Sequence, residues 1–210
     1  MGQIDLYCER LGPAFWAEPI NALTNVAFLI AAWGMWRLSR RASALSPGVW
    51  LLIATSVAIG VGSFAFHTAA TPWARVLDIV PILVFQLVFL WLYGRGVIAL
   101  SRPACGLLLL GFFAAAMLGR QFPEILNGSL IYAPAFLVIF ALGIYHARTT
   151  SSGRFDLLAA AGVFVASIFF RSIDNAVCDA FPPGTHFLWH VLNGGVVYLA
   201  ARAFIRHRQN

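Results

Sequence analysis

The sequence has little charge and no lysine: 10% of its 210 residues are charged, and all fourteen basic residues are arginine. Soluble domains usually carry about 25% charged residues, so this composition, with 60% hydrophobic residues, excludes a soluble globular domain. The first eighteen residues also lack the basic start, apolar centre and small-residue cleavage site of a secretory signal. We therefore interpret residues 1–18 as a retained extracytoplasmic segment at the membrane surface.

Seven apolar stretches follow, each close to the length of roughly 20 residues that a helix needs to cross a bilayer. They lie near residues 19–38, 48–66, 74–93, 103–118, 130–145, 156–170 and 186–204. No linker between them is long enough to divide two domains. The sequence therefore predicts one all-α integral membrane domain over residues 1–210, built as a bundle of seven transmembrane helices.

The arginines are distributed unevenly between the two sides of this predicted bundle. If the amino terminus lies outside, ten arginines fall in cytoplasmic segments and four on the opposite face. Cytoplasmic loops are enriched in basic residues, so we expect the amino terminus outside and the carboxyl terminus in the cytoplasm. The same asymmetry accounts for the net charge of +6, and no nucleic-acid partner is needed to explain it.

Three histidines fall in one layer near the outer side. His67 ends the second stretch, whereas His186 and His190 begin the seventh, four residues apart and thus on one helix face. Ser63 precedes the first of them by one turn, and Asp78 follows near the start of the third stretch. Ionisable groups inside membrane segments are costly and usually mark a function, so this layer is the candidate site.

Three imidazoles suit a catalytic zinc ion, because catalytic sites provide three protein ligands and leave a position for water, whereas structural sites are closed by four. Zinc lowers the pKa of its bound water to about 7. Asp78 is placed to take a proton from that water or to orient a histidine. Ser63 is placed to donate a hydrogen bond to a carbonyl oxygen as charge develops on it. Together these residues predict metal-assisted hydrolysis of an ester or an amide at membrane depth.

Two other polar pairs have local interpretations. Asn21 and Asn25 lie one turn apart in the first stretch, where their side chains need partners. They either join helices or support the site. Arg171 and Asp174, three residues apart after the sixth stretch, are most simply interpreted as a local ion pair at a helix end.

The pattern of Ser63, His67, Asp78 and the string His186-Phe187-Leu188-Trp189-His190, spread over seven helices, resembles the alkaline ceramidase family. That family shares a superfamily with adiponectin-type receptors and lipid-remodelling hydrolases. Further similar strings are Tyr7-Cys8-Glu9, Glu18 to Asn25, Gly62 to Thr68, Leu77-Asp78, and Asp174 with Cys178. The resemblance implies zinc on the three histidines, with Asp78 and Ser63 as catalytic partners. It also implies hydrolysis of a ceramide-like membrane lipid to a sphingoid base and a fatty acid.

The resemblance further implies a calcium ion near the amino terminus. In the family its ligands come from an Asp-Trp-Cys-Glu-x-Asn stretch and from the glutamate before the first helix. Glu9 and Glu18 match, whereas Leu6 and Leu11 replace the aspartate and the asparagine, which leaves Asp5 as a substitute ligand with a shifted backbone. Calcium prefers six to eight oxygen ligands, and Asp5, Glu9 and Glu18 are the candidates here.

The resemblance also matches Cys8 and Cys178 to paired cysteines, with two free thiols as the alternative. Two other functions stay open: a receptor or lipid-binding protein with a structural zinc, and an esterase or lipase that remodels lipid anchors. The arginine-only, alanine-rich composition indicates a bacterial genome of high GC content. We therefore expect a multi-pass protein of the bacterial inner membrane, with its site towards the periplasm.

Overall fold

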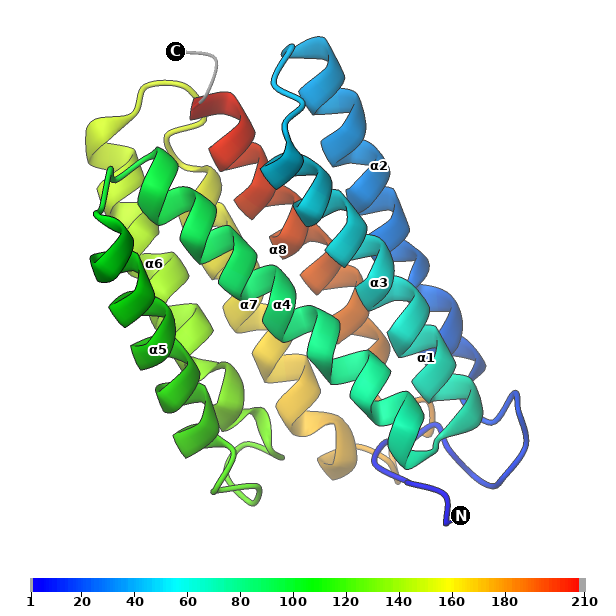
Figure 1. The fold of residues 1–210 in the computed structure, drawn as a ribbon. Helices are drawn as coiled ribbons and strands as arrows, with labels where there is room; N and C mark the ends of the chain where they lie inside the picture. The colour runs from blue at the N-terminus through cyan, green and yellow to red at the C-terminus, as the bar shows by residue number, and fades with distance from the viewer. Residues whose placement is uncertain (1, 208–210) are drawn as a thin grey trace.

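The computed structural model describes residues 2–207, and their helices run side by side in one bundle (Figure 1). The α-helices are α1 (Pro19–Thr24), α2 (Val26–Arg41), α3 (Pro47–Ala69), α4 (Pro72–Gly96), α5 (Arg102–Gly119), α6 (Ala133–Thr149), α7 (Asp156–Ile173) and α8 (His186–His207). Two 3-10 helices, η1 (Ser129–Tyr132) and η2 (Asp174–Ala176), adjoin α6 and α7. The prediction of an all-α fold is confirmed.

Six of these helical segments are long and apolar enough to cross a membrane: α3, α4, α5, η1 with α6, α7 with η2, and α8. The chain is therefore an integral multi-pass membrane protein. The expectation of a single helix over residues 19–38 is wrong, because Asn25 separates α1 from α2. The Asn25 side-chain nitrogen donates to the Asn21 carbonyl at 2.9 Å, so the side chain competes with the helical backbone for that acceptor.

Helix α8 lies at the centre of the bundle and packs against α2, α3, α4 and α7. Small residues allow its close approach to α2, since a Cβ atom built on Gly194 would lie 2.9 Å from the Ala27 carbonyl oxygen. Buried alanines at 200, 201 and 203 continue this surface toward the carboxyl-terminal half of α8. The first turns of α8 are thereby fixed beside the start of α2 and the end of α3.

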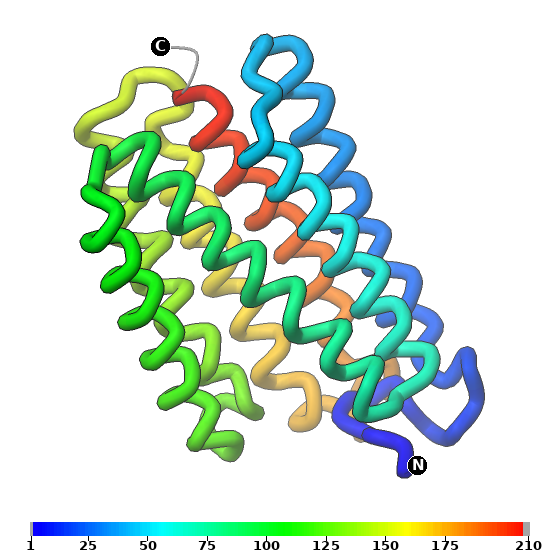
Figure 2. The backbone as a smooth tube through the Cα atoms, viewed as in Figure 1, coloured from blue at the N-terminus to red at the C-terminus, as the bar shows by residue number. Residues whose placement is uncertain are grey.

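Several connecting segments gather at one end of the bundle, which we call the amino-terminal end (Figure 2). It holds residues 2–18, the turn between α3 and α4, the loop after α5 and the loop between α7 and α8, whereas the last turn of α8 lies at the opposite end. A disulfide between Cys8 and Cys178, with Cα atoms 5.2 Å apart, joins the first of these segments to the last. The pairing implied by the family resemblance is confirmed.

Candidate functional site

The three predicted histidines meet at the amino-terminal end of the bundle. His67, His186 and His190 are all buried, and each offers a ring nitrogen within 4.8 Å of the others. Within residues 2–207 this is the group of histidine, cysteine or acidic side chains that converges closely enough to hold an ion. The prediction that the second and seventh stretches bring these rings together is confirmed, and the group is consistent with a metal ion such as zinc.

Asp174 fixes the start of α8 and with it two of these rings. One carboxylate oxygen accepts hydrogen bonds from the backbone N–H groups of Thr185 at 2.6 Å and His186 at 2.9 Å. The other accepts from the Cys8 N–H at 3.1 Å. Orphan N–H groups at a helix start favour a negative charge there. Asp174 therefore acts as the cap of α8, and the simple interpretation of an ion pair with Arg171 is wrong.

The hydrogen bonds around His67 and His190 determine which of their ring nitrogens is free. His67 Nδ1 lies 2.6 Å from a carboxylate oxygen of Glu18, an acceptor, so Nδ1 is the protonated nitrogen. His190 Nδ1 lies 3.0 Å from Thr24 Oγ1, whose own proton is donated to the Ile20 carbonyl at 2.8 Å. In the neutral form of each ring, this arrangement leaves Nε2 available as a ligand atom.

These two Nε2 atoms face each other at 3.1 Å. A tetrahedral zinc ion with Zn–N distances of 2.0–2.1 Å separates two ligand nitrogens by about 3.3 Å, so the spacing fits a shared ion. His186 adds a buried Nδ1 that has no hydrogen-bond partner, and its ring stacks on Tyr7 with centroids 3.6 Å apart. The two facing Nε2 atoms and the unpartnered nitrogen of His186 form a donor set that fits a cation.

Glu18, which the sequence indicated as a candidate calcium ligand, instead lies beside His67. Its carboxylate is buried, and it binds Arg10 Nε at 2.5 Å as well as His67. Burial alone would raise the pKa of Glu18, but the hydrogen bonds and charges of His67 and Arg10 together lower it. The remaining nitrogens of Arg10 donate to the carbonyls of Gly12 at 3.1 Å and of His67 at 2.9 Å.

The residues expected to bind calcium do not fit that ion. Glu18 is paired with Arg10, so an arginine already supplies the positive charge beside it. Glu9 accepts from the backbone N–H groups of Ile20 at 2.7 Å and Asn21 at 2.8 Å and thus caps α1. Asp5 is exposed, and it does not form a metal-binding group with the two glutamates in the described part of the chain. The expectation of calcium is not supported.

Ser63 and Asp78 come together because α3 and α4 touch beside them. A Cβ atom built on Gly62 would lie 2.0 Å from the Leu77 carbonyl oxygen, so only glycine permits this approach. The Ser63 hydroxyl lies within hydrogen-bonding reach of the Asp78 carboxylate, which also interacts with His67. Asp78 is not among the converging ligand atoms, and it instead lines a cavity of about 610 Å³ at the amino-terminal end.

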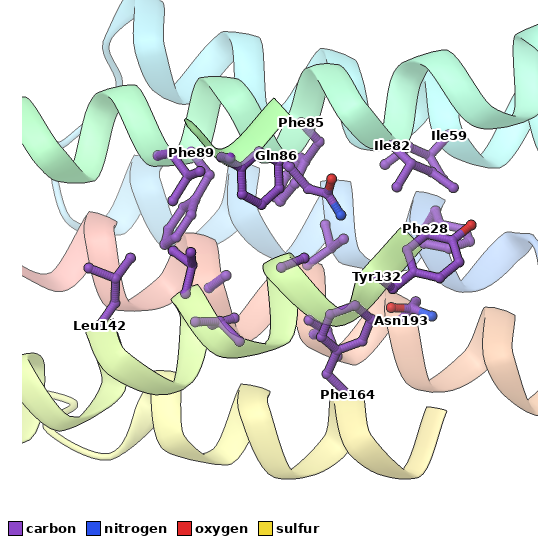
Figure 3. Close-up of a pocket in the computed structure, with 18 of the residues that line it drawn as sticks. Phe28, Ile59, Ile82, Phe85, Gln86, Phe89, Tyr132, Leu142, Phe164 and Asn193 are labelled. Atoms are coloured by element: carbon purple, nitrogen blue, oxygen red, sulfur yellow. The ribbon is translucent and has the colours of Figure 1, made fainter. Parts of the chain in front are cut away.

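A second, apolar cavity lies within the bundle. Figure 3 shows Phe28 of α2, Phe85 and Phe89 of α4, and Phe164 of α7 on its walls. Trp189, the neighbour of His190, belongs to this lining, and Tyr132 lines both cavities. A polar cavity and an apolar one therefore meet at Tyr132.

The signals for the polar partners of the histidines were weak in the sequence. Glu18 is 49 residues from His67, and Thr24 is 166 residues from His190, so no spacing rule connects them. Their common signal was the string from Glu18 to Asn25, which the resemblance had already singled out. Arg10 lies in an otherwise acidic segment and belongs to no recognisable motif, so the sequence did not indicate its contact with Glu18.

Comparison with known proteins agrees with this geometry. No curated protein matches the chain. A family model described as Ceramidase matches residues 7–210, which include every residue of the histidine site and of its polar supports. The chain therefore belongs to the ceramidase family, and this membership implies an enzyme that hydrolyses the amide bond of ceramide.

Proposed function

We propose that the protein is a zinc-dependent membrane amidase that hydrolyses ceramide-like lipids to a sphingoid base and a fatty acid. The observation that supports this most is the pair of Nε2 atoms of His67 and His190, which lie 3.1 Å apart in a buried site. A metal ion between these nitrogens would be bound by both, and His186 offers a third nitrogen to it. Three ligands leave a position for water or substrate, as in catalytic zinc sites.

The chemical roles follow from where the polar side chains lie. Zinc, when bound, polarises the amide carbonyl and lowers the pKa of water. Asp78 accepts the proton of the water that attacks the carbonyl carbon, and then passes it to the amide nitrogen as the C–N bond breaks. Ser63 turns its hydroxyl from Asp78 to the carbonyl oxygen and stabilises the negative charge that develops there.

The supports around the histidines hold this arrangement in place. Glu18 keeps His67 protonated on Nδ1, and Thr24 does the same for His190, so that Nε2 of each ring stays available. Arg10 compensates the buried charge of Glu18 and also binds the carbonyl of His67. A carboxylate–histidine contact of this kind raises the basicity of the ring as a metal ligand.

The two cavities support a lipid substrate. The apolar cavity suits an acyl chain in its chemistry, since its lining includes Ile59, Leu90 and Val197 besides aromatic rings, but its volume of about 80 Å³ requires the walls to open around the chain. The polar head suits the cavity that Asp78 lines. The amide bond would then lie at their junction near Tyr132, within reach of the histidine layer.

We further propose that the amino-terminal end of the bundle faces the periplasm of a bacterial inner membrane, with the carboxyl terminus in the cytoplasm. The arginine asymmetry supports this orientation. The Cys8–Cys178 disulfide at the same end supports it independently, because disulfides persist in oxidising compartments.

The experiment is a comparison of amide and ester lipids with purified, zinc-loaded protein in detergent. We expect release of fatty acid from ceramide, loss of release in His190→Ala together with loss of zinc, and loss of release in Asp78→Ala. Faster cleavage of acyl esters than of amides would favour an esterase on the same scaffold. If metal-loaded protein released no fatty acid from any amide or ester lipid, a receptor with a structural zinc would replace this proposal.

A further inference from the structure

Arg171, near the end of α7, is a cation at the site whose charge interacts with Asp78 but which has no carboxylate in direct contact. Its Nη1 donates to the Asn127 carbonyl at 2.8 Å and to Ser129 Oγ at 2.7 Å, both neutral acceptors. Among residues 2–207 no carboxylate oxygen lies within 4.0 Å of its guanidinium nitrogens, whereas Arg10, Arg202 and Arg206 have such partners. Charged groups within membrane segments are usually paired or functional, so this arginine needs an explanation.

The position of the Arg171 side chain is fixed from several sides. Its guanidinium lies 5.4 Å from the ring centre of Tyr132 and 5.6 Å from that of Trp189. Trp189 lies between the two histidines of α8 in sequence, so the charge is held close to the histidine layer. Asn127, which binds Arg171, is itself bound by the Asn175 side chain at 3.2 Å. A cation held in this way is prepared to bind an anion with little loss of conformational entropy.

The cavity around Arg171 carries more positive than negative charge. Arg75 and Arg120 also line it, both are exposed, and neither has a carboxylate oxygen within 4.0 Å among the residues described. The acidic residues of its lining are Asp5 and Asp78. Its fourth arginine, Arg10, is neutralised by Glu18 outside the lining. Arg75, Arg120 and Arg171 thus exceed Asp5 and Asp78 by one positive charge, even though Asp78 interacts with Arg171 and Arg75.

We propose that this cavity binds an anionic group, a carboxylate or a phosphate, carried on the head of the lipid amide, with Arg171 as the central contact and Arg75 and Arg120 at the rim. The inference rests on the proposed amidase function and narrows its substrate class. Ceramide has a neutral head, which leaves the three arginines unused. A phosphorylated ceramide-like lipid or an acyl amino acid supplies the missing charge, and guanidinium groups bind both anions in bidentate fashion.

The geometry assigns the anion to the head rather than to the acyl end. The acyl chain has the apolar cavity available, and its carbonyl carbon must reach the histidine layer for attack. The amine side of the amide then extends into the cavity that the arginines line. The fatty acid product is also an anion, however, so the experiment has to separate these two sources.

The test compares matched substrates that share one acyl chain. Ceramide is compared with its head-phosphorylated form, and an acyl amino acid with its methyl ester. We expect the anionic member of each pair to have a lower KM, by about tenfold or more, since a hydrogen bond to a charged group corresponds to one to two decades in affinity. Equal KM values for wild-type protein would overturn the proposal while leaving the amidase function intact.

Substitutions of single arginines test which of them cause the preference for the anionic substrate. Arg171→Gln and, separately, Arg120→Gln should reduce the preference for the anionic member, and Arg171→Lys should restore much of it. Arg120→Gln is included because the Arg120 side chain is exposed, so this substitution should not disturb folding. Arg148→Gln, an exposed arginine in the last turn of α6, is the matched control and should leave the preference unchanged. An unchanged preference in both test variants would overturn the assignment to these arginines.

A last experiment tests whether the arginines bind the fatty acid product instead of the head group. One result would place the anion at the acyl end and overturn the proposal. In it, a fatty acid inhibits the wild-type protein but the corresponding fatty alcohol does not, this inhibition is lost in Arg171→Gln, and the wild-type protein shows no preference for an anionic head group. If no lipid amide were hydrolysed, the amidase function itself would fail. Thermal stabilisation of the protein by anionic lipid over its neutral counterpart, absent in Arg171→Gln, would then still support anion binding in the cavity.

Discussion

The Glu18 carboxylate lies 2.6 Å from Nδ1 of His67, although 49 residues separate them in the chain. This contact connects the segment before α1 to the last turn of α3, and it orients the ring that faces His190. Arg10 completes the arrangement by binding Glu18 on its other oxygen. The histidine site is therefore assembled from the amino-terminal segment as well as from the long helices.

Replacing Glu18 with glutamine should weaken zinc binding. The amide keeps the size of the side chain but removes the charge that raises the basicity of His67, and such outer partners typically contribute 10–100-fold in metal affinity. Competition with a chelator of known affinity measures the change. Glu124→Gln, at an exposed position in the loop after α5, is the control. Unchanged affinity in Glu18→Gln would show that the carboxylate serves packing alone.

Calcium should have no effect on this protein. The carboxylates that were candidates for binding it are already committed, Glu18 to Arg10 and Glu9 to the first N–H groups of α1. Removal of calcium by a selective chelator, with zinc kept in excess, should change neither the melting temperature nor the rate of amide cleavage. A rise in melting temperature on adding calcium would contradict the assignment of Arg10 as the cation of this site.

Asp78→Asn should lower kcat by about 10²–10⁴-fold while the protein keeps its zinc, because general acid–base catalysis contributes roughly that factor. The asparagine side chain has the size of the aspartate and still lies beside Ser63, but it cannot accept a proton from water. Metal analysis beside the kinetics separates chemistry from structure. Loss of zinc together with activity would instead make Asp78 a support of the histidines. Asp179→Asn, on the exposed loop before α8, is the matched control.

The histidine layer could be predicted from sequence because helical periodicity determines it. A four-residue spacing places His186 and His190 on one face, and alternating helix directions bring His67 to the same side. The kink at Asn25 was not predictable in this way, since hydropathy does not report that a side chain takes a backbone carbonyl. Asp174 was misassigned for a similar reason: its partners are N–H groups 11 and 12 residues later, which no local spacing indicates.

Thiol counting should confirm the disulfide in protein purified without reductant. Denatured, unreduced protein should react at Cys105 alone, and reduced protein at three cysteines, since Cys8 and Cys178 are bonded. The bond closes a loop with a sequence separation of 170, so its loss in Cys8→Ser with Cys178→Ser should lower thermal stability, in the direction expected from loop-closure entropy. Three reactive thiols before reduction would contradict the pairing.

Gly62→Ala should separate Ser63 from Asp78. The added Cβ atom would lie 2.0 Å from the Leu77 carbonyl oxygen, and because that neighbour is backbone, α3 and α4 must move apart. Overpacking of this kind typically costs about 1–3 kcal/mol, and we expect a lower melting temperature together with a lower kcat. Gly111→Ala in α5 is the control, since no atom lies within 4 Å of its added Cβ and alanine suits a helix better than glycine. Zinc content should be measured beside kcat, because His67 lies on α3 with Gly62 and its displacement would lower metal binding as well. Full activity in Gly62→Ala would mean that the contact between α3 and α4 does not position the proposed catalytic pair.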